Sequence, residues 1–194
     1  MGVRDPVLSW FRSYLTNRRQ QVVIDGTMFD WKYVQAGVPQ GSVLGPLLFL
    51  VYINDITDSI QSTCFLYADD TSLLEIVEDP QLTSAKLNSD LINISKWTRD
   101  WLVTINPSKT EAMIFSTKRN KPVHPALYYE GNEIDIVSSH KHLGVPLSSN
   151  LSWRTHILNI HDKASKRLNL LKGLKLKINR NTLDKLYKSL ISKG

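Results

Sequence analysis

The sequence predicts an α+β fold, with short antiparallel hairpins and packed helices followed by a mainly helical C-terminal part. Strand-forming runs come in pairs separated by turn residues, as around Asp25-Gly26. Between these pairs, apolar residues recur every three or four positions, most regularly in Thr83–Trp101 and again from Trp153 onward. A chain of 194 residues is long enough to bury one substantial core.

The first part of the chain predicts two helices with a hairpin and a loop between them. Helical spacing of apolar residues indicates an amphipathic helix over Pro6–Arg18. The β-branched run Gln21–Ile24 predicts a strand, and its return strand follows the Asp-Gly turn. Glycine and proline make Gly37–Ser42 a loop. The apolar run Leu44–Ile56 predicts a helix that opens near Pro46 and is buried on most sides.

The next feature is a hairpin with two acidic residues at its tip. Cys64–Tyr67 and Thr71–Leu74 are strand-forming runs, and Ala68, Asp69 and Asp70 separate them. Neighbouring carboxylates repel each other, and a divalent cation offsets that repulsion. Mg²⁺ is suited to this role, because it binds one or two carboxylates together with substrate phosphates. An ordinary solvated turn is the alternative that these residues alone leave open.

Beyond this hairpin, the sequence predicts one long helix and a second hairpin. Thr83–Trp101 carries its apolar residues on one face, which we expect to pack on a sheet. Leu102–Ile105 and Ala112–Ser116 alternate as strands do, and they flank a turn at Asn106–Lys109. Two prolines and several charges make Lys118–Pro125 the best candidate for a linker.

The C-terminal part predicts short strands and then two helices. Ala126–Gly144 has the pattern of short strands with a turn at Gly131-Asn132. Helical spacing predicts one helix from Trp153 and a second from about Asn181. The second helix meets the chain end at Gly194 without a natural stop, and we expect both ends of the chain to be truncations.

The composition favours an intracellular protein that lies outside membranes. The longest apolar run, Val43–Ile53, is shorter than the roughly 20 residues that a helix needs to cross a bilayer. Cys64 is the only cysteine, which excludes an intrachain disulfide. The N-terminal residues contain no apolar signal core. We therefore expect a nuclear or cytoplasmic location.

Positive charge is concentrated in the C-terminal part of the chain. Residues 1–116 contain 9 Lys or Arg and 13 Asp or Glu, a net charge of −4. Residues 117–194 contain 15 Lys or Arg and 5 Asp or Glu, a net charge of +10. Clustered basic residues are typical of a surface that binds nucleic acid phosphates. A solvated helical face rich in lysine is the alternative, and charge alone does not decide between them.

Two motifs in combination resemble a known family. The stretch Ala36–Ile56 contains Pro39-Gln40-Gly41, and Tyr67-Ala68-Asp69-Asp70 follows shortly after it. This combination resembles the reverse transcriptases of non-LTR (LINE-type) retrotransposons, and the likeness runs from Trp10 to Ile157. It implies an RNA-directed DNA polymerase that transfers a nucleotide from a dNTP to a primer 3′-hydroxyl. The implied fold is a polymerase palm followed by a helical thumb, an incomplete right-hand fold.

The resemblance implies roles for individual residues. Asp69 and Asp70 would be catalytic and would hold Mg²⁺, with Mn²⁺ as the alternative ion. A glycine lets the backbone approach the nucleotide closely, and a glutamine amide can both donate and accept hydrogen bonds. The residues expected to bind the substrate are Pro39, Gln40, Gly41, Tyr67 and Ala68. The implied partners are an RNA template, a DNA primer and a dNTP, and the oligomeric state stays open.

A catalytic lysine is implied by a second match. Trp101–Thr110 looks like the family's Gly-Leu-x-x-Asn-x-x-Lys-Thr motif, although Trp101 stands where glycine is usual. Lys109 would then lie near the triphosphate and stabilise or protonate the leaving pyrophosphate. A solvated loop lysine beside Glu111 is the alternative.

A primer-binding hairpin and a division into domains are also implied. His142–Val145 resembles the primer-grip hairpin, in which Leu143 and Gly144 would form the turn, while Pro146 departs from the usual pattern. The expected domains are partial fingers and palm (1–117), the end of the palm with the primer grip (118–152) and the basic thumb (153–194).

One expected feature is missing from the sequence. Reverse transcriptases also bind their metals through an aspartate of an earlier palm strand, and Asp5, Asp25 and Asp30 do not stand in its setting. We therefore expect the chain to begin after that strand and to be inactive alone. The alternative function is that of a catalytically incomplete retroelement remnant that only binds nucleic acid. An RNA-dependent RNA polymerase is disfavoured, because those enzymes usually have glycine where Ala68 stands.

Overall fold

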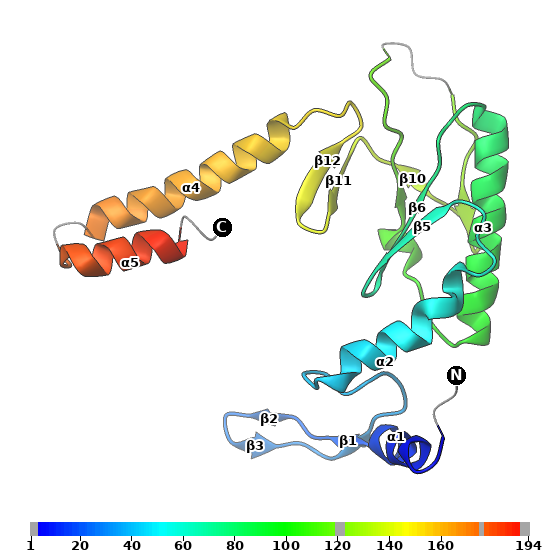
Figure 1. Ribbon diagram of the computed structural model, residues 1–194, viewed down its shortest axis with the longest axis horizontal. Coiled ribbons are helices and arrows are strands. Elements are labelled where there is room, and N and C mark those ends of the chain that lie inside the picture. The colour runs from blue at the N-terminus through cyan, green and yellow to red at the C-terminus, as the bar shows by residue number, and fades with distance from the viewer. Residues whose placement is uncertain (1–3, 119–122, 175–176, 191–194) are drawn as a thin grey trace. The chain divides into compact units, whose positions relative to one another are not determined.

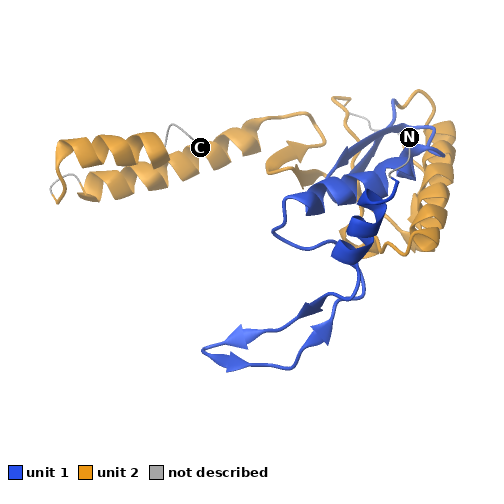
Figure 2. Cartoon of the chain, turned by 60° about the horizontal axis from the view of Figure 1, so that its bottom comes forward, with its two compact units in different colours: residues 1–76 blue, residues 77–194 orange. Residues whose placement is uncertain are grey.

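The computed structural model describes residues 4–118, 123–174 and 177–190, and its contacts divide the chain into two compact units (Figures 1 and 2). Unit 1 is Met1–Ile76 and unit 2 is Val77–Gly194. The elements of unit 1 are α1 (Val7–Leu15), β1 (Arg19–Gln20), β2 (Val23–Ile24), β3 (Thr27–Met28), β4 (Lys32–Tyr33), α2 (Leu44–Ile53), the 3-10 turn η1 (Asn54–Thr57), β5 (Thr63–Tyr67) and β6 (Asp70–Leu74).

Helix α1 and the hairpin after it form where they are predicted, although the helix is shorter than the predicted Pro6–Arg18. The helix follows Pro6, whose ring suits a helix start, and it ends at Leu15. Strand β1 pairs with β4, and β2 pairs with β3, so the hairpin is a ladder of two short antiparallel sheets. Asp25 and Gly26 both have positive φ, 49° and 81°, which is the type I′ turn that joins such strands most readily.

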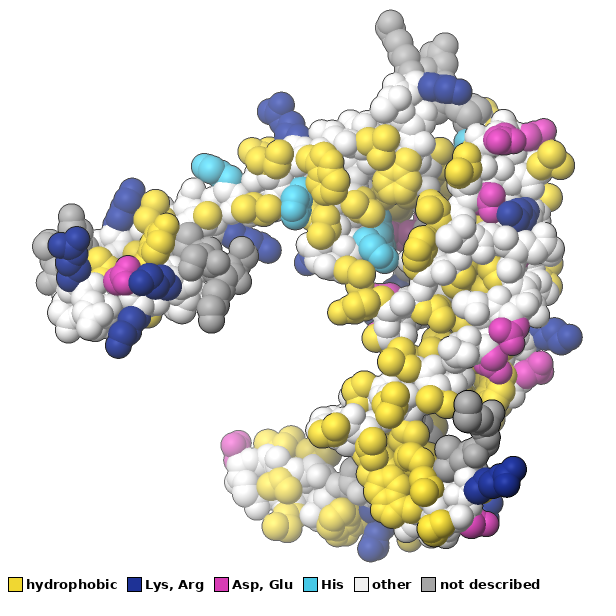
Figure 3. Space-filling model, viewed as in Figure 1, with side chains coloured by type: hydrophobic (Ala, Val, Ile, Leu, Met, Phe, Trp, Pro, Cys, Tyr) yellow, Lys and Arg dark blue, Asp and Glu magenta, His cyan; other side chains and the backbone are white. Residues whose placement is uncertain are grey.

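Helix α2 forms where its apolar run predicts, but the expectation that it is buried on most sides is wrong. Gly45 and Ile53 are its buried residues, whereas Leu50 and Val51 are 50% and 70% exposed. Figure 3 shows apolar side chains open on the molecular surface. The physical reason is that α2 is apolar all round, while its main packing within unit 1 is against the η1 turn at its C-terminal end.

The hairpin of β5 and β6 has the predicted form. The two strands pair residue by residue from Thr63 opposite Leu74 to Tyr67 opposite Asp70. This leaves a loop of two residues, Ala68 and Asp69. The regular register fixes the tip of the hairpin, since a shift by one residue would move every side chain to the other face.

Unit 2 contains the long helix, several short strands and the two C-terminal helices. Its elements are α3 (Pro80–Asp100), the 3-10 turn η2 (Pro107–Lys109), β7 (Glu111–Ala112), β8 (Tyr128–Tyr129), β9 (Asn132–Glu133), β10 (Asp135–Ile136), β11 (Ser139–His142), β12 (Val145–Ser148), α4 (Arg154–Leu174) and α5 (Arg180–Leu190). The turn between β8 and β9 is Glu130-Gly131, one residue earlier than predicted.

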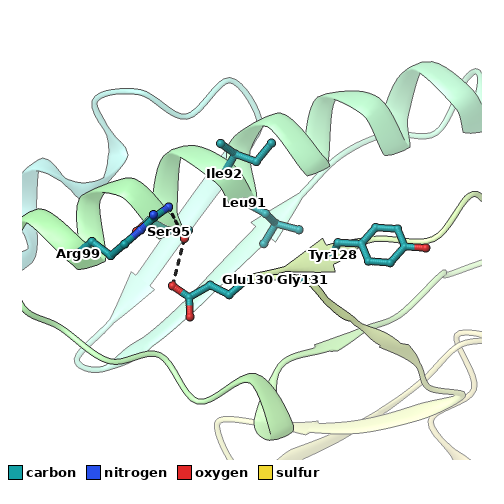
Figure 4. Close-up of a pocket in the computed structure, with 7 residues that line it drawn as sticks. All are labelled: Leu91, Ile92, Ser95, Arg99, Tyr128, Glu130 and Gly131. Carbon is teal, nitrogen blue, oxygen red and sulfur yellow. Dashed lines mark hydrogen bonds between the residues drawn. The ribbon is translucent and has the colours of Figure 1, made fainter.

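Helix α3 packs on β8 through the face that its apolar spacing predicts. Leu91 and Ile94 of the helix are buried, as is Tyr129 of the strand at 2% exposure. Polar side chains reinforce this contact. The Ser95 hydroxyl donates a hydrogen bond to the Glu130 carboxylate at 3.1 Å and accepts one from Arg99 (Figure 4).

The predicted hairpin around Asn106 is wrong. Residues 102–105 form no strand, and β7 pairs in parallel with β10. The Asn106 side chain accepts a hydrogen bond from Ser108 N, so Pro107–Lys109 closes into a 3-10 turn. An Asn-Pro sequence favours this local turn over a hairpin loop. Within the predicted linker, residues 119–122 lie outside the described part of the chain.

The α+β class holds, but the sheet is smaller than expected. The described residues form six sheets of two strands each, of which β7 with β10 is parallel. The predicted helices after Trp153 are present, and α4 and α5 pack against each other around buried Leu171 (Figure 1). Across the described ranges, no helix combines the length and the apolar character that a membrane crossing requires.

We expect Asp79→Ala to lower the free energy of unfolding by about 1 kcal/mol, measured by urea denaturation followed by circular dichroism. Asp79 precedes α3, and its carboxylate accepts hydrogen bonds from Gln81 N at 2.7 Å and Leu82 N at 3.4 Å. Glu78→Ala removes a neighbouring exposed carboxylate that does not cap the helix, and we expect a change within about 0.5 kcal/mol. Equal losses from the two substitutions would contradict the capping role.

Candidate functional site

The two candidate catalytic carboxylates lie at the tip of the β5–β6 hairpin. Tyr67 ends β5 and pairs with Asp70, the first residue of β6, and Ala68 and Asp69 form the loop between them. All four residues are exposed. The hairpin therefore presents two neighbouring carboxylates where a substrate can reach them.

The turn at this tip is strained. Ala68 has a φ of 50°, in the left-handed region that favours glycine. In two-residue hairpin loops, a positive φ at the first loop residue only is the pattern of the type II′ turn, in which glycine usually takes that place. An alanine there costs about 1–2 kcal/mol. Strain of this kind collects at functional sites, where the surrounding structure maintains it.

The chemistry of the tip fits Mg²⁺. Within the described ranges, no side chain forms a hydrogen bond or an ion pair with the Asp69 or Asp70 carboxylate, so both remain open to a cation. Mg²⁺ is commonly held by one or two carboxylates, and water and substrate phosphates complete its coordination. In the same part of the chain, no three His, Cys, Asp or Glu side chains group closely enough to hold a metal ion by themselves.

The Pro39-Gln40-Gly41 turn belongs to the same unit and is fastened to the start of α2. The Ser42 hydroxyl donates a hydrogen bond to Pro39 O at 2.7 Å and accepts one from Gly45 N at 2.9 Å. Serine thereby serves the first turn of α2 as an N-cap does. Gln40 and Gly41 stay exposed, and Gly41 has a φ of 74° that suits glycine.

Gly45 is a site residue that the sequence prediction missed. A Cβ on this residue would lie 2.8 Å from Pro39 O and 2.8 Å from the Ser42 hydroxyl oxygen. Only glycine therefore leaves room for the Pro39-Gln40-Gly41 turn that packs against it. The available signal was the spacing from Ser42 to Gly45, which is that of a helix cap and its third residue.

Lys109 lies in unit 2, at the end of the η2 turn. Asn106 fixes this turn, because its carboxamide oxygen accepts hydrogen bonds from Ser108 N at 3.0 Å and from the Ser108 hydroxyl at 2.7 Å. Lys109 is exposed. Glu111, the neighbour that could have held the lysine in an ion pair, instead contacts His140 at 2.7 Å.

The predicted primer-grip turn is also in unit 2 and has a defined geometry. Leu143 and Gly144 join β11 to β12 and have φ values of 48° and 88°, which is the type I′ pattern. Both residues are exposed. The His140–Glu111 contact connects this hairpin with the strand that follows Lys109, so the structure brings these two predicted segments together.

Helices α4 and α5 carry the basic surface. They contain eight Lys or Arg and two Asp, and the basic side chains are exposed. On α5, a hydrogen bond from Lys188 to the Asp184 carboxylate at 2.8 Å, together with the negative charge of that carboxylate, raises the pKa of Lys188 above its ordinary value. The other basic residues of the two helices are Arg154, Lys163, Lys166, Arg167, Lys172, Arg180 and Lys185.

Comparison with known proteins shows the family of the chain. Residues 1–147 match the family described as "Reverse transcriptase (RNA-dependent DNA polymerase)". The chain is 30% identical over 177 residues to the "Probable RNA-directed DNA polymerase from transposon BS" of Drosophila melanogaster, which covers 87% of this chain and 20% of that protein. It is 28% identical over 198 residues to the "RNA-directed DNA polymerase from mobile element jockey" of Drosophila funebris. That match covers 94% of this chain and 21% of the relative.

The matches extend over most of this chain but only part of the relatives. The chain spans about a fifth of the length of these curated relatives. No solved structure matches it. The predicted resemblance to the polymerases of non-LTR retrotransposons is confirmed, and the chain belongs to the reverse transcriptase (RNA-dependent DNA polymerase) family.

Proposed function

We propose that this chain forms palm and thumb parts of an RNA-directed DNA polymerase, which adds nucleotides from dNTPs to a primer 3′-hydroxyl on an RNA template. The observation that carries the proposal is the Tyr67–Asp70 tip, where two exposed carboxylates stand side by side on a fixed hairpin. Membership of the reverse transcriptase family supports it.

In unit 1, Asp69 and Asp70 would hold Mg²⁺, and Gln40 and Gly41 would border the incoming dNTP. When bound, the metal ions supply charge that stabilises the attacking and leaving oxygens of the displacement at phosphorus. The exposed Gln40 amide can donate to or accept from the nucleotide, and the Gly41 backbone can approach it closely. Tyr67 and Pro39 would form the edges of this site.

In unit 2, Lys109 would act on the leaving pyrophosphate. Its ammonium forms no ion pair with a described residue, and the Asn106 turn holds its backbone in place. An unpaired, mobile ammonium can stabilise the leaving charge or donate a proton to it. The exposed Leu143-Gly144 turn would contact the 3′ end of the primer, where a glycine gives the backbone access.

The exposed Lys and Arg side chains of α4 and α5 would grip the template-primer duplex by its phosphates. A basic surface of this kind contacts the backbone of the duplex and does not read its sequence. This agrees with a polymerase, which must copy templates of any sequence.

We expect Asp69→Asn and Asp70→Asn to reduce primer extension on an RNA template by roughly a hundredfold or more, because each removes a metal-binding charge and keeps the shape of the side chain. The assay uses the longest polypeptide that contains residues 1–194. Asp58→Asn makes the same change at an exposed aspartate of unit 1 outside the site, and we expect it to retain activity.

Equal nucleotide incorporation by all three variants would contradict the assignment of Asp69 and Asp70 as metal-binding catalytic residues. Salt-dependent binding of RNA or DNA without any incorporation by the unsubstituted protein would favour the alternative, a nucleic-acid-binding remnant.

We expect Gly45→Ala to raise the KM for dNTP by roughly tenfold, since the added methyl group must displace the backbone at Pro39. Gly173→Ala is the matched control, because a Cβ there meets no atom within 4 Å and an alanine suits the interior of α4. Steady-state primer extension with varied dNTP measures both. A KM for Gly45→Ala within twofold of the control would contradict the packing argument.

A further inference from the structure

Arg18 lies between the end of α1 and the segment that leads to the Pro39-Gln40-Gly41 turn. Its Nε donates a hydrogen bond to Leu15 O at 3.0 Å. Its Nη2 donates to Ala36 O at 3.3 Å and also to Gly37 O. One side chain thereby joins the backbone at Leu15 to the backbone at Ala36 and Gly37, which lie 18 and 19 residues beyond Arg18 in the sequence.

The backbone of Arg18 adds a second connection to the same segment. Val34 N donates a hydrogen bond to Arg18 O at 2.9 Å, directly beyond the β1–β4 pair. In an extended strand, successive carbonyls point to opposite sides. Gly37 has a φ of 78°, and this turn lets the carbonyls of residues 36 and 37 meet one guanidinium. The segment is therefore shaped to bind this side chain.

Arginine has the chemistry that this position requires. A guanidinium presents several N–H donors in one plane, whereas a lysine ammonium is a compact charge on a flexible stem. Leu15 O is one of the last carbonyls of α1, which have no partner within the helix, and a cation is favoured at that end. The half-buried Arg18 thus links the end of α1 to the loop.

We propose that Arg18 is a positioning residue that sets the place of the Pro39-Gln40-Gly41 turn for nucleotide binding. The turn then has an anchor at each end, since Arg18 holds the backbone up to Gly37 and Ser42 holds it on the far side. This inference rests on the proposed function, because it takes the turn to border the dNTP. Arg18 itself touches backbone and has no part in the chemistry.

The first test measures how tightly the loop is held. Limited proteolysis with elastase, which cleaves after small residues such as Ala36, reports opening of this segment, and mass spectrometry locates the cut. We expect Arg18→Gln to speed cleavage there by about fivefold to tenfold, and Arg18→Lys to restore part of the protection. Arg19→Gln is the matched control, because the guanidinium of Arg19 lies over the Trp31 ring at 5.6 Å instead.

The second test separates positioning from a general loss of structure. In primer extension by the longest polypeptide that contains the chain, we expect Arg18→Gln to raise the KM for dNTP about fivefold to tenfold, with kcat changed less than about twofold. Arg18→Lys should fall between the two, and Arg19→Gln should leave both constants unchanged. A merely structural role would lower the active fraction, and with it the apparent kcat, while KM stayed the same.

The outcomes distinguish this inference from the proposed function. Unchanged cleavage near Ala36 in Arg18→Gln would overturn the anchor and leave the polymerase assignment intact. Faster cleavage with an unchanged KM would overturn the positioning role. Faster cleavage in a protein that incorporates no nucleotide even when unsubstituted would overturn the proposed function, and the role in nucleotide binding with it.

Discussion

The site depends on the ability of a two-stranded hairpin to hold two carboxylates at neighbouring positions. Two such charges repel by about 1 kcal/mol even in water at a separation of about 4 Å, and the left-handed alanine between the strands adds its own cost. The β5–β6 ladder offsets both, because it is paired without interruption up to Tyr67 and Asp70. A cation at the tip would remove the repulsion and leave the strand register unchanged.

The turns proposed to bind substrate share one way of being held in place. Their residues are exposed, so burial cannot hold these turns in one conformation. Short polar side chains hold them instead, through hydrogen bonds to the nearby backbone. Ser42 does this for the turn before α2, and Asn106 does it for the turn that ends in Lys109. Such local hydrogen bonds contribute about 1 kcal/mol each and need few neighbours. These hydrogen bonds therefore hold the turns in place while their residues stay exposed to solvent.

Much of the fold could be predicted, because its signals are local. Asp25-Gly26 specifies its own turn, and the tip at Asp69 follows from two strand-forming runs around it. The parallel pairing of Glu111 with Asp135 joins residues 24 positions apart, and no short sequence pattern predicts it. The role of Arg18 was missed for the same reason, since its partner Ala36 lies 18 residues further along the chain. The role of Gly45 depends on the Pro39 carbonyl, which folds back close to it, and the spacing from Ser42 to Gly45 was its one local signal.

The contact between His140 and Glu111 has a mechanical consequence. An exposed pair of this kind contributes little to stability. It acts, however, together with the hydrogen bond from Ser116 N to Ser149 O, so the segment after Lys109 is connected to the Leu143-Gly144 hairpin and its end at two points. A movement of that hairpin would carry the lysine with it.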